Sequence, residues 1–457
     1  MLAIKRRLNE FQDSPVNNLM AGLVMSLVLI PEAIGFASVA GFSPETGLYG
    51  AIFLTIAIAI TGSRVAMITS ASGSTAVLMT GLAVHGNSLA NNKGIILLLT
   101  ASFFAGCFQI LWGILGAGKL MKFVPKAVVS GFVNALALLI IQAELPQLGF
   151  DQLLGLERHQ DIGLLPTTAQ LPSIWILSAI GIAIVYLAPR LTRLIPAQLI
   201  SIVVITVIST MLQLKIPKVG DLGSLPEGLH SPMLPWMIQS DQILSTSEIL
   251  TITLPIAIAI SLVGLLETFL TVDYIDTLTD TRTSKKNEAI GQGVANIISS
   301  IFGGMAGCAL VGESVMNNKN GANSRLSTLS TGIFILIIVV YGKNLLSEIP
   351  LAAVVAVMIT IALETADSDS IKSIGKKPSI DTLLMVATFL ASMATHPHNL
   401  AFGVVVGVLD AVVVGEEVGD VVRKGVVDAR LQKQLERAVV HRPLLVARQA
   451  PRAAPTQ

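Results

Sequence analysis

Glu267 and Thr271 stand four residues apart within an apolar run from Ile249 to Val272. A helix places residues four apart on one face, and the run exceeds the roughly 20 residues that cross the hydrocarbon core of a bilayer. An ionisable side chain at that depth is costly, so it normally faces a cavity and a partner. The pair therefore predicts half of a cation-coupling site for Na⁺ or H⁺. The structural alternative is a carboxyl group held neutral by a neighbouring helix.

Two further carboxylates, Glu32 and Glu313, stand in other apolar or small-residue segments. Glu32 directly follows Pro31, and proline kinks a helix because it lacks an N–H donor. Both glutamates are candidates for a proton site or a second cation site. The alternative for Glu32 is a solvent-exposed position near the end of a span. The alternative for Glu313 is a position on the inner, aqueous side of the membrane.

Two segments, Ile68–Leu82 and Gly303–Gly321, read ITSASGSTAVLMTGL and GGMAGCALVGESVMNNKNG. Each begins with small and polar residues and then offers only about ten apolar positions, too few for one regular membrane-spanning helix. Short, glycine-interrupted segments at corresponding places in two halves of a chain indicate a binding site between discontinuous helices. Polar loops are the alternative interpretation.

Half-helices that begin at Ser72 and near Ala309 would present free backbone N–H groups and positive dipole ends at mid-membrane. Two such ends that face one cavity form an anion site without Lys or Arg. Glycine allows close approach of the backbone to a ligand, whereas a serine in this place also suits a helix cap. The predicted substrate-binding residues are Ser70, Ser72, Gly73, Ser74, Ala309 and Leu310.

The composition predicts an all-α polytopic membrane protein. Of 457 residues, 53% are hydrophobic and 13% charged, whereas soluble domains carry about 25% charged residues. A β-barrel would show weak alternation instead of long apolar runs. The two cysteines form neither a disulfide framework nor a metal-binding spacing. Because no nucleophile triad, P-loop or metal cluster stands in the sequence, we predict no enzyme, no metal beyond Na⁺ and no nucleic-acid partner.

Fourteen transmembrane segments are predicted. They are Asn17–Phe36, Thr46–Thr61, Ser72–Val84, Gly94–Leu115, Phe123–Gln142, Ile174–Ala188, Ile195–Leu214, Ser247–Val272, Glu288–Phe302, Ala309–Asn318, Leu326–Tyr341, Ile349–Glu364, Asp381–Thr395 and Leu400–Val418.

The two halves of the chain have matching spacings. Glu32 precedes Ser72 by 40 residues, and Glu267 precedes Ala309 by 42. Copies of seven spans each must be inverted relative to one another. The predicted organisation is a cytoplasmic N-terminal segment (1–16), a first seven-span repeat (17–214), an extracytoplasmic connector (215–246), a second seven-span repeat (247–418) and a partly disordered cytoplasmic tail (419–457).

The distribution of Lys and Arg predicts the orientation. With fourteen spans, 17 of these 30 residues fall in loops on the side of the termini, five in the opposite loops and eight in the tail. Positive charge concentrates in cytoplasmic loops. Both termini should therefore be cytoplasmic, in a bacterial inner or plasma membrane.

Several ordered motifs resemble the SulP family, the sulfate permease group that includes prestin and the pendrin-type exchangers. The resemblance extends over roughly Asn17 to Val406. The motifs are AGLVMSLVLIPEAIGFASVAGFSPETGLYG (21–50), TSASGS (69–74), FVPKAVVSGFVNALALLIIQ (123–142) and DTLTDTRTSKKNEAIGQGVANIISSIFGGMAGCALVGESVMNNKNGANSRLS (276–327).

The resemblance implies a seven-plus-seven inverted repeat, divided into core and gate domains that move as an elevator. The oligomeric state stays open, with a homodimer as the candidate assembly. It implies transport of sulfate, bicarbonate, chloride or a small carboxylate. In the sodium-dependent bicarbonate transporters of the family, of the BicA type, the cation site matches Glu267 and Thr271 together with the backbone of Gly307, Cys308 and Ala309.

Three features depart from the family pattern. Glu267 replaces the aspartate of BicA-type members, which makes H⁺ an alternative to Na⁺. Glu313 stands near the place where animal members often carry a basic residue. About forty residues follow Val418, too few for the core of the cytoplasmic STAS domain that most members append, so we expect an inner-face helix and a disordered end.

These observations predict secondary active transport of a small inorganic anion, sulfate or bicarbonate, coupled to Na⁺ or H⁺. The predicted partners are the anion and the lipid bilayer. Two alternatives remain: a nucleobase–cation symporter of the same architecture, and a passive anion channel or exchanger.

Overall fold

The computed structural model describes residues 14–88, 93–116, 118–119, 124–150, 166–192, 195–226, 228–229, 231–235, 245–374, 380–394, 402–404, 406–407 and 410. The predicted N-terminal segment, the cytoplasmic tail and most of the last predicted span therefore lie outside the described residues, wholly or nearly so.

The described residues form helices joined by short connections. The helices are α2 (Pro15–Ala40), α3 (Pro44–Thr61), α4 (Gly73–Ser88), α5 (Lys93–Leu115), α6 (Lys126–Glu144), α8 (Leu171–Leu191), α9 (Ala197–Met211), α10 (Thr246–Thr279), α11 (Lys285–Ile301), α12 (Val311–Lys319), α13 (Arg325–Ser347), α14 (Leu351–Thr365), α15 (Ser368–Ile374) and α16 (Ile380–Ala394), with 3-10 turns η2 (Pro146–Leu148) and η3 (Val219–Asp221).

Seven of the described helices are long and apolar enough to cross a bilayer, by length and composition: α2, α3, α5, α6, α8, α10 and α13. Helices α9, α14 and α16 are shorter apolar helices. Each of the first thirteen predicted segments overlaps one of the helices in the described part of the chain. The helical membrane fold is thus confirmed, while the full set of fourteen spans stays a prediction.

Strands β1 (Thr69–Ala71) and β2 (Gly307–Ala309) pair antiparallel, with Thr69 opposite Ala309 and Ala71 opposite Gly307. One strand comes from each half of the chain, and all six residues are buried. A Cβ atom at Gly307 would lie 1.9 Å from the carbonyl oxygen of Ser70. Only glycine therefore allows the two strands to approach this closely.

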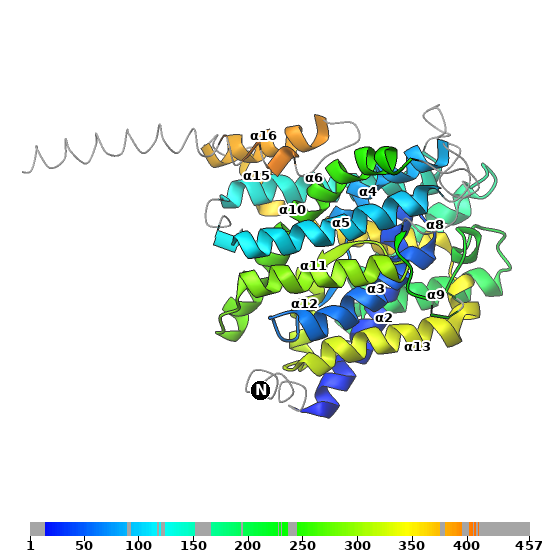
Figure 1. The fold of residues 1–457 in the computed structure, drawn as a ribbon. Helices are drawn as coiled ribbons and strands as arrows, with labels where there is room; N and C mark the ends of the chain where they lie inside the picture. The colour runs from blue at the N-terminus through cyan, green and yellow to red at the C-terminus, as the bar shows by residue number, and fades with distance from the viewer. Residues whose placement is uncertain are drawn as a thin grey trace, which may run out of the picture.

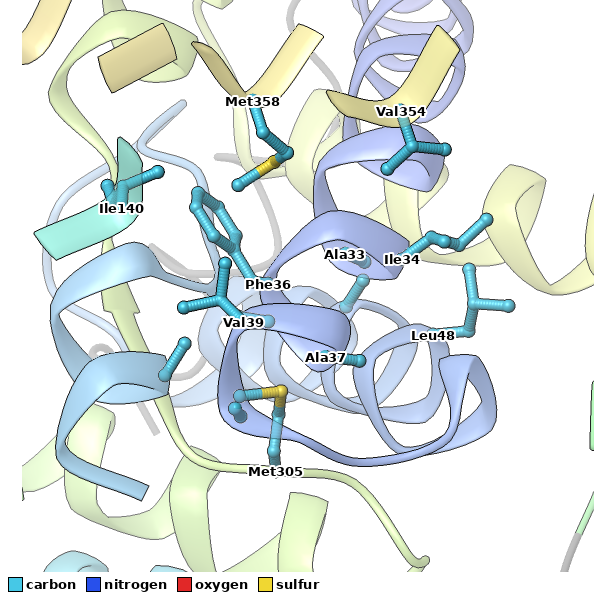
Figure 2. Close-up of a cluster of buried hydrophobic side chains, with 14 of the residues drawn as sticks. Ala33, Ile34, Phe36, Ala37, Val39, Leu48, Ile140, Met305, Val354 and Met358 are labelled. Carbon is cyan, nitrogen blue, oxygen red and sulfur yellow. The ribbon is translucent and has the colours of Figure 1, made fainter. Parts of the chain in front are cut away.

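The largest apolar core surrounds α2. Figure 2 shows Phe36 of α2 beside Ile140 of α6 and Met358 of α14. On the other side of the same helix, Ile34 lies near Leu48 of α3. Pro31 stands inside α2 without ending it. Because α2 is buried on nearly all sides from Met25 to Ala40, the absence of an amphipathic pattern there is expected.

Contacts among the helices divide them into two groups. The half-helix group comprises α2–α5 and α10–α13, in which α11 packs along α5 and α13 along α2 and α3. Figure 1 shows α5 and α11 side by side. The flanking group comprises α6, α8, α9, α14 and α16, where α14 packs against α6 and α8. Helices α2 and α4 form the main contacts with the flanking group.

Candidate functional site

The two half-helices begin at one cavity. Helix α4 starts directly after β1 and α12 directly after β2, so the strand crossing brings their N-termini together. A cavity of about 640 Å³ is lined there by Ser72, Gly73, Ala309, Leu310, Val311 and Gly312. The first N–H groups of a helix lack intrahelical partners, and the helix dipole makes that end positive. The cavity therefore has two helix ends of positive polarity.

The cavity walls are mostly apolar. Helix α6 of the flanking group supplies Phe132, Val133, Leu136 and Ile140, and α2 supplies Val28 and Phe36. Four carboxylates also line it: Glu32, Glu267, Glu313 and Glu364. Lys319, at the end of α12, is the only basic residue among the described lining residues. The site thus combines positive backbone ends with acidic side chains.

Glu267 of α10 lies behind the strand crossing and reaches the cavity. The Ser74 hydroxyl donates a 2.7 Å hydrogen bond to Glu267 Oε2. The Cys308 thiol approaches the same oxygen at 2.6 Å and the Ser72 hydroxyl at 3.1 Å. The carboxyl group therefore contacts residues that belong to both half-helix segments.

Thr271 does not line the cavity. Its buried hydroxyl lies 2.8 Å from the carbonyl oxygen of Glu267 and 3.3 Å from that of Ala309. Thr271 thereby ties α10 to β2. The predicted pairing of Glu267 and Thr271 on one helix face is correct, but the two side chains face different surroundings.

Polar residues of α11 hydrogen-bond to the backbone of β2 where it pairs with β1. Asn296 accepts from the Gly307 N–H at 2.9 Å and donates to the Gly307 carbonyl at 3.2 Å. Gln292 donates to the same carbonyl at 3.0 Å. Because the Gly307 backbone is already fully hydrogen-bonded, it holds the site in place. Neither residue was predicted as part of the site, although the polar residues of QGVAN (292–296) inside a predicted span were a signal.

Glu32 and Glu313 line the same cavity. Glu32 is 2% exposed, and its Oε2 atom has no hydrogen-bond partner in the described structure. Glu313 stands on the first turn of α12, which packs against α2. Glu32 is thus buried in the cavity wall, and its role stays a prediction. Glu313 lines the cavity beside it.

Residues 16–388 match the sulfate permease family. The chain belongs to this family. Sulfate permease family proteins are transporters rather than enzymes, so the predictions of a SulP-type anion transporter and of no enzyme are confirmed.

Relatives in this family are described as sulfate or bicarbonate transporters. The chain is 38% identical over 392 residues to YbaR of Bacillus subtilis (strain 168), described as a putative sulfate transporter, covering 86% of this chain and 75% of that protein. It is 27% identical over 411 residues to the bicarbonate transporter BicA of Picosynechococcus sp., covering 86% of this chain and 69% of the relative.

Two solved structures show the same fold as this sulfate permease family chain. The transmembrane domain of a cyanobacterial BicA matches with a TM-score of 0.70 at 24% identity, over 88% of this chain and 98% of that one. SLC26A9 matches with a TM-score of 0.71 at 18% identity, over 88% of this chain and 66% of that one. At these identities the matches establish the fold alone.

The structure places the predicted substrate-binding residues in two positions. Ser72, Gly73, Ala309 and Leu310 line the cavity. Ser70 pairs with Cys308 in the strand crossing, and Ser74 binds Glu267. Neither of these two serines is a cavity-lining residue. Among the described residues, no group of three or more His, Cys, Asp or Glu side chains is arranged to hold a metal ion.

Proposed function

We propose that this protein is a secondary active transporter of sulfate or bicarbonate, driven by H⁺ or Na⁺ bound at Glu267. One observation carries the proposal: the N-termini of α4 and α12, from opposite halves of the chain, open on one cavity with Glu267 directly behind them. Free N–H groups at helix N-termini bind oxyanions. The family match favours an anion over the nucleobase of the alternative prediction.

The contacts of Glu267 support its role as the coupling residue. Ser74 and Cys308 hold one carboxyl oxygen, and Ser72, which contacts the same thiol, lines the cavity. A cation on Glu267 removes a negative charge beside the anion site, so the cation and the anion should each bind more tightly when the other is present. Coupling requires this reciprocal effect.

The two helix groups support an elevator movement. Both half-helices, Glu267 and the strand crossing belong to the half-helix group, while α6 and α14 line the opposite wall of the cavity from the flanking group. Movement of one group against the other would carry the anion and the cation together. The charge asymmetry supports cytoplasmic termini, and the family resemblance supports a homodimer.

Uptake of radiolabelled sulfate and bicarbonate into proteoliposomes tests this function. The full chain should accumulate one of the two anions against its gradient when an inward H⁺ or Na⁺ gradient is imposed. The gradient that drives accumulation identifies the coupling ion. Downhill flux without accumulation under either gradient would show a channel or exchanger instead.

Replacement of the coupling carboxylate separates coupling from folding. Glu267→Gln keeps an oxygen that accepts from Ser74 but cannot carry a cation, so gradient-driven accumulation should fall to background while the protein stays monodisperse. Thr365→Val, at the edge of the cavity on α14, serves as a control and should still accumulate the anion. Normal gradient-driven accumulation by Glu267→Gln would remove Glu267 from the mechanism.

A further inference from the structure

A second cavity, here called the Arg64 pocket, has a volume of about 660 Å³. The link between α3 and β1, the ends of α10 and α12 and the residues before α13 line it. Its polar groups come from Arg64, Thr279, Thr281, Asn318, Lys319 and Asn323. Lys319 also lines the central cavity at the half-helix N-termini. The two cavities therefore share this side chain.

Arg64 is a buried cation with a donor that remains unused. Its side chain is 8% exposed. Nη1 and Nη2 donate 2.8 Å hydrogen bonds to the hydroxyls of Thr281 and Thr279, and Nη1 lies 3.5 Å from Asp276 Oδ1. The Nε atom is buried and has no hydrogen-bond partner among the described residues. A buried donor without an acceptor is costly, and an oxyanion in the pocket would supply that acceptor.

The charges of the Arg64 pocket favour an anion. Arg64 and Lys319 are its two ionisable lining residues, and no carboxylate lines it among the described residues. Asp276, beside Arg64, also accepts hydrogen bonds from Thr281 and Thr283. Lys319 is exposed and forms no ion pair with a described residue. The central cavity, in contrast, is lined by four carboxylates and one lysine.

We propose that the Arg64 pocket is a second anion-binding site, which receives the transported sulfate or bicarbonate after the anion leaves the half-helix N-termini. This inference rests on the proposed anion transport and adds the next site on the route of the anion. A guanidinium N–H and an ammonium group form short, charge-assisted hydrogen bonds to oxyanions. Lys319 can contact the anion from either cavity.

The location of the pocket gives the direction of this step. Arg64 and Lys319 both stand in loops on the side that the charge distribution predicts to be cytoplasmic. The elements that line the pocket belong to the half-helix group, so the pocket would move together with the half-helix N-termini. The Arg64 pocket would thus be the site from which the anion enters the cytoplasm.

Alkylation of a cysteine placed in the pocket measures anion binding there. Leu278 lines the pocket and is 50% exposed, so Leu278→Cys provides a reporter. The full-chain variant in detergent reacts with N-ethylmaleimide, a neutral reagent, in sulfate, bicarbonate or inorganic phosphate at constant ionic strength. Peptide mass spectrometry counts modification at position 278 alone, which excludes reaction at Cys107 and Cys308. Sulfate or bicarbonate at about ten times its dissociation constant should slow the reaction by up to about tenfold.

Substitutions of the two cations connect this protection to the pocket. Arg64→Gln and Lys319→Gln, each combined with Leu278→Cys, should abolish the protection because each removes one of the two positive charges. Lys319→Arg keeps the charge and should restore it. Because Lys319 is exposed, its variants decide the matter even where Arg64→Gln does not fold. Leu191→Cys, 88% exposed at the end of α8 and outside the pocket, should react at one rate with and without the anion.

The pattern of protection decides the inference. Saturable protection by sulfate or bicarbonate that is lost in Lys319→Gln and restored in Lys319→Arg supports it. Protection by phosphate alone, or unchanged protection in Lys319→Gln, overturns it. Absence of any protection also overturns it, and the two cations would then only neutralise the negative C-terminal ends of α10 and α12. Lack of accumulation by the parent protein would defeat the proposed transport function, while protection at position 278 would still decide whether the pocket binds an anion.

Discussion

The residue that controls the geometry of the site is Gly307, because two strands and one helix meet at its backbone. Its carbonyl accepts from Gln292 and Asn296, and its N–H donates to Asn296. The missing side chain is equally important, since the Ser70 carbonyl group occupies the space of a Cβ atom. The geometry of the proposed anion site thus depends on a residue that does not line the cavity.

Gly307→Ala should destabilise the protein strongly. Its Cβ would meet the Ser70 carbonyl oxygen at 1.9 Å and the carbonyl carbon at 2.5 Å. Because neighbouring backbone must shift, we expect a loss of at least about 2 kcal/mol of stability, visible as a lower melting temperature in detergent. Gly312→Ala is the matched control, since nothing lies within 4 Å of its Cβ position. Equal melting temperatures for the two variants would contradict this account.

Glu267 shows why the environment of a residue matters as much as its type. Glu267 and Glu32 both line the cavity, and both stand in apolar runs of similar character. Glu267 contacts a hydroxyl and a thiol, whereas the Oε2 atom of Glu32 is buried without a hydrogen-bond partner among the described residues. The two carboxylates were found from the sequence, but their surroundings come from segments that only the fold brings together.

At the scale of elements, hydrogen bonds join α6 to the connection between α14 and α15, within the flanking group. The Ser130 hydroxyl of α6 donates a 2.6 Å hydrogen bond to Asp367, and the Asp367 N–H donates to Asn134 at 2.8 Å. Asn134 in turn donates to the Ser370 hydroxyl at 2.9 Å. These bonds connect α6, which lines the cavity, to the end of α14.

This link predicts a pH-dependent stability. The hydrogen bond from Ser130 holds the pKa of Asp367 below its ordinary value of 3.8. A carboxyl group with a lowered folded-state pKa stabilises the fold above its unfolded pKa, and this contribution is lost as the pH falls through the folded-state pKa. Ser130→Ala should therefore lower the melting temperature at neutral pH, with a smaller difference in acid below the ordinary pKa of Asp367.

The control for this prediction is Ser347→Ala, which removes an exposed hydroxyl that bonds within its own helix. It should leave the melting temperature nearly unchanged at both pH values. A difference between Ser130→Ala and the parent protein that stays constant into acid would show that the Asp367 carboxylate does not stabilise the link.

The short elements explain which parts of the site could be predicted. The half-helices were predictable because small and polar residues interrupt their apolar runs, and a ten-residue helix cannot cross a bilayer. Helix α4 begins one residue and α12 two residues from the predicted start points. The pairing of β1 with β2 was not predictable, since three-residue strands leave no pattern in a sequence. The positions of Ser70 and Ser74 away from the cavity follow from that pairing.

At the scale of the whole molecule, the division into two helix groups was implied by the family resemblance and not by any residue pattern. Hydropathy identifies spans but not their neighbours, because apolar surface toward lipid and apolar surface toward protein look alike in a sequence. The contributions of Phe132, Leu136 and Glu364 to the cavity illustrate this limit. All three come from the flanking group, and none was a predicted site residue.

The division predicts that a bridge between the groups stops transport. Gln147, in η2 after α6, donates a 2.7 Å hydrogen bond to the Ser38 hydroxyl near the end of α2, so this contact joins the two groups. A short bifunctional thiol reagent on Ser38→Cys/Gln147→Cys should fix the groups together and abolish anion uptake, with recovery after reduction. The measurement is radiolabelled uptake into proteoliposomes before cross-linking, after it and after reduction.

A bridge within one group gives the matched control. Asn18 of α2 donates a 2.7 Å hydrogen bond to Asn323, which precedes α13 in the same half-helix group. The same reagent on Asn18→Cys/Asn323→Cys should leave uptake intact, because these residues would move together. Each single-cysteine variant treated alike accounts for reaction at Cys107 and Cys308. Full uptake by a completely cross-linked Ser38–Gln147 pair would mean that the groups do not move at this contact, and transport would then require a smaller movement inside the cavity.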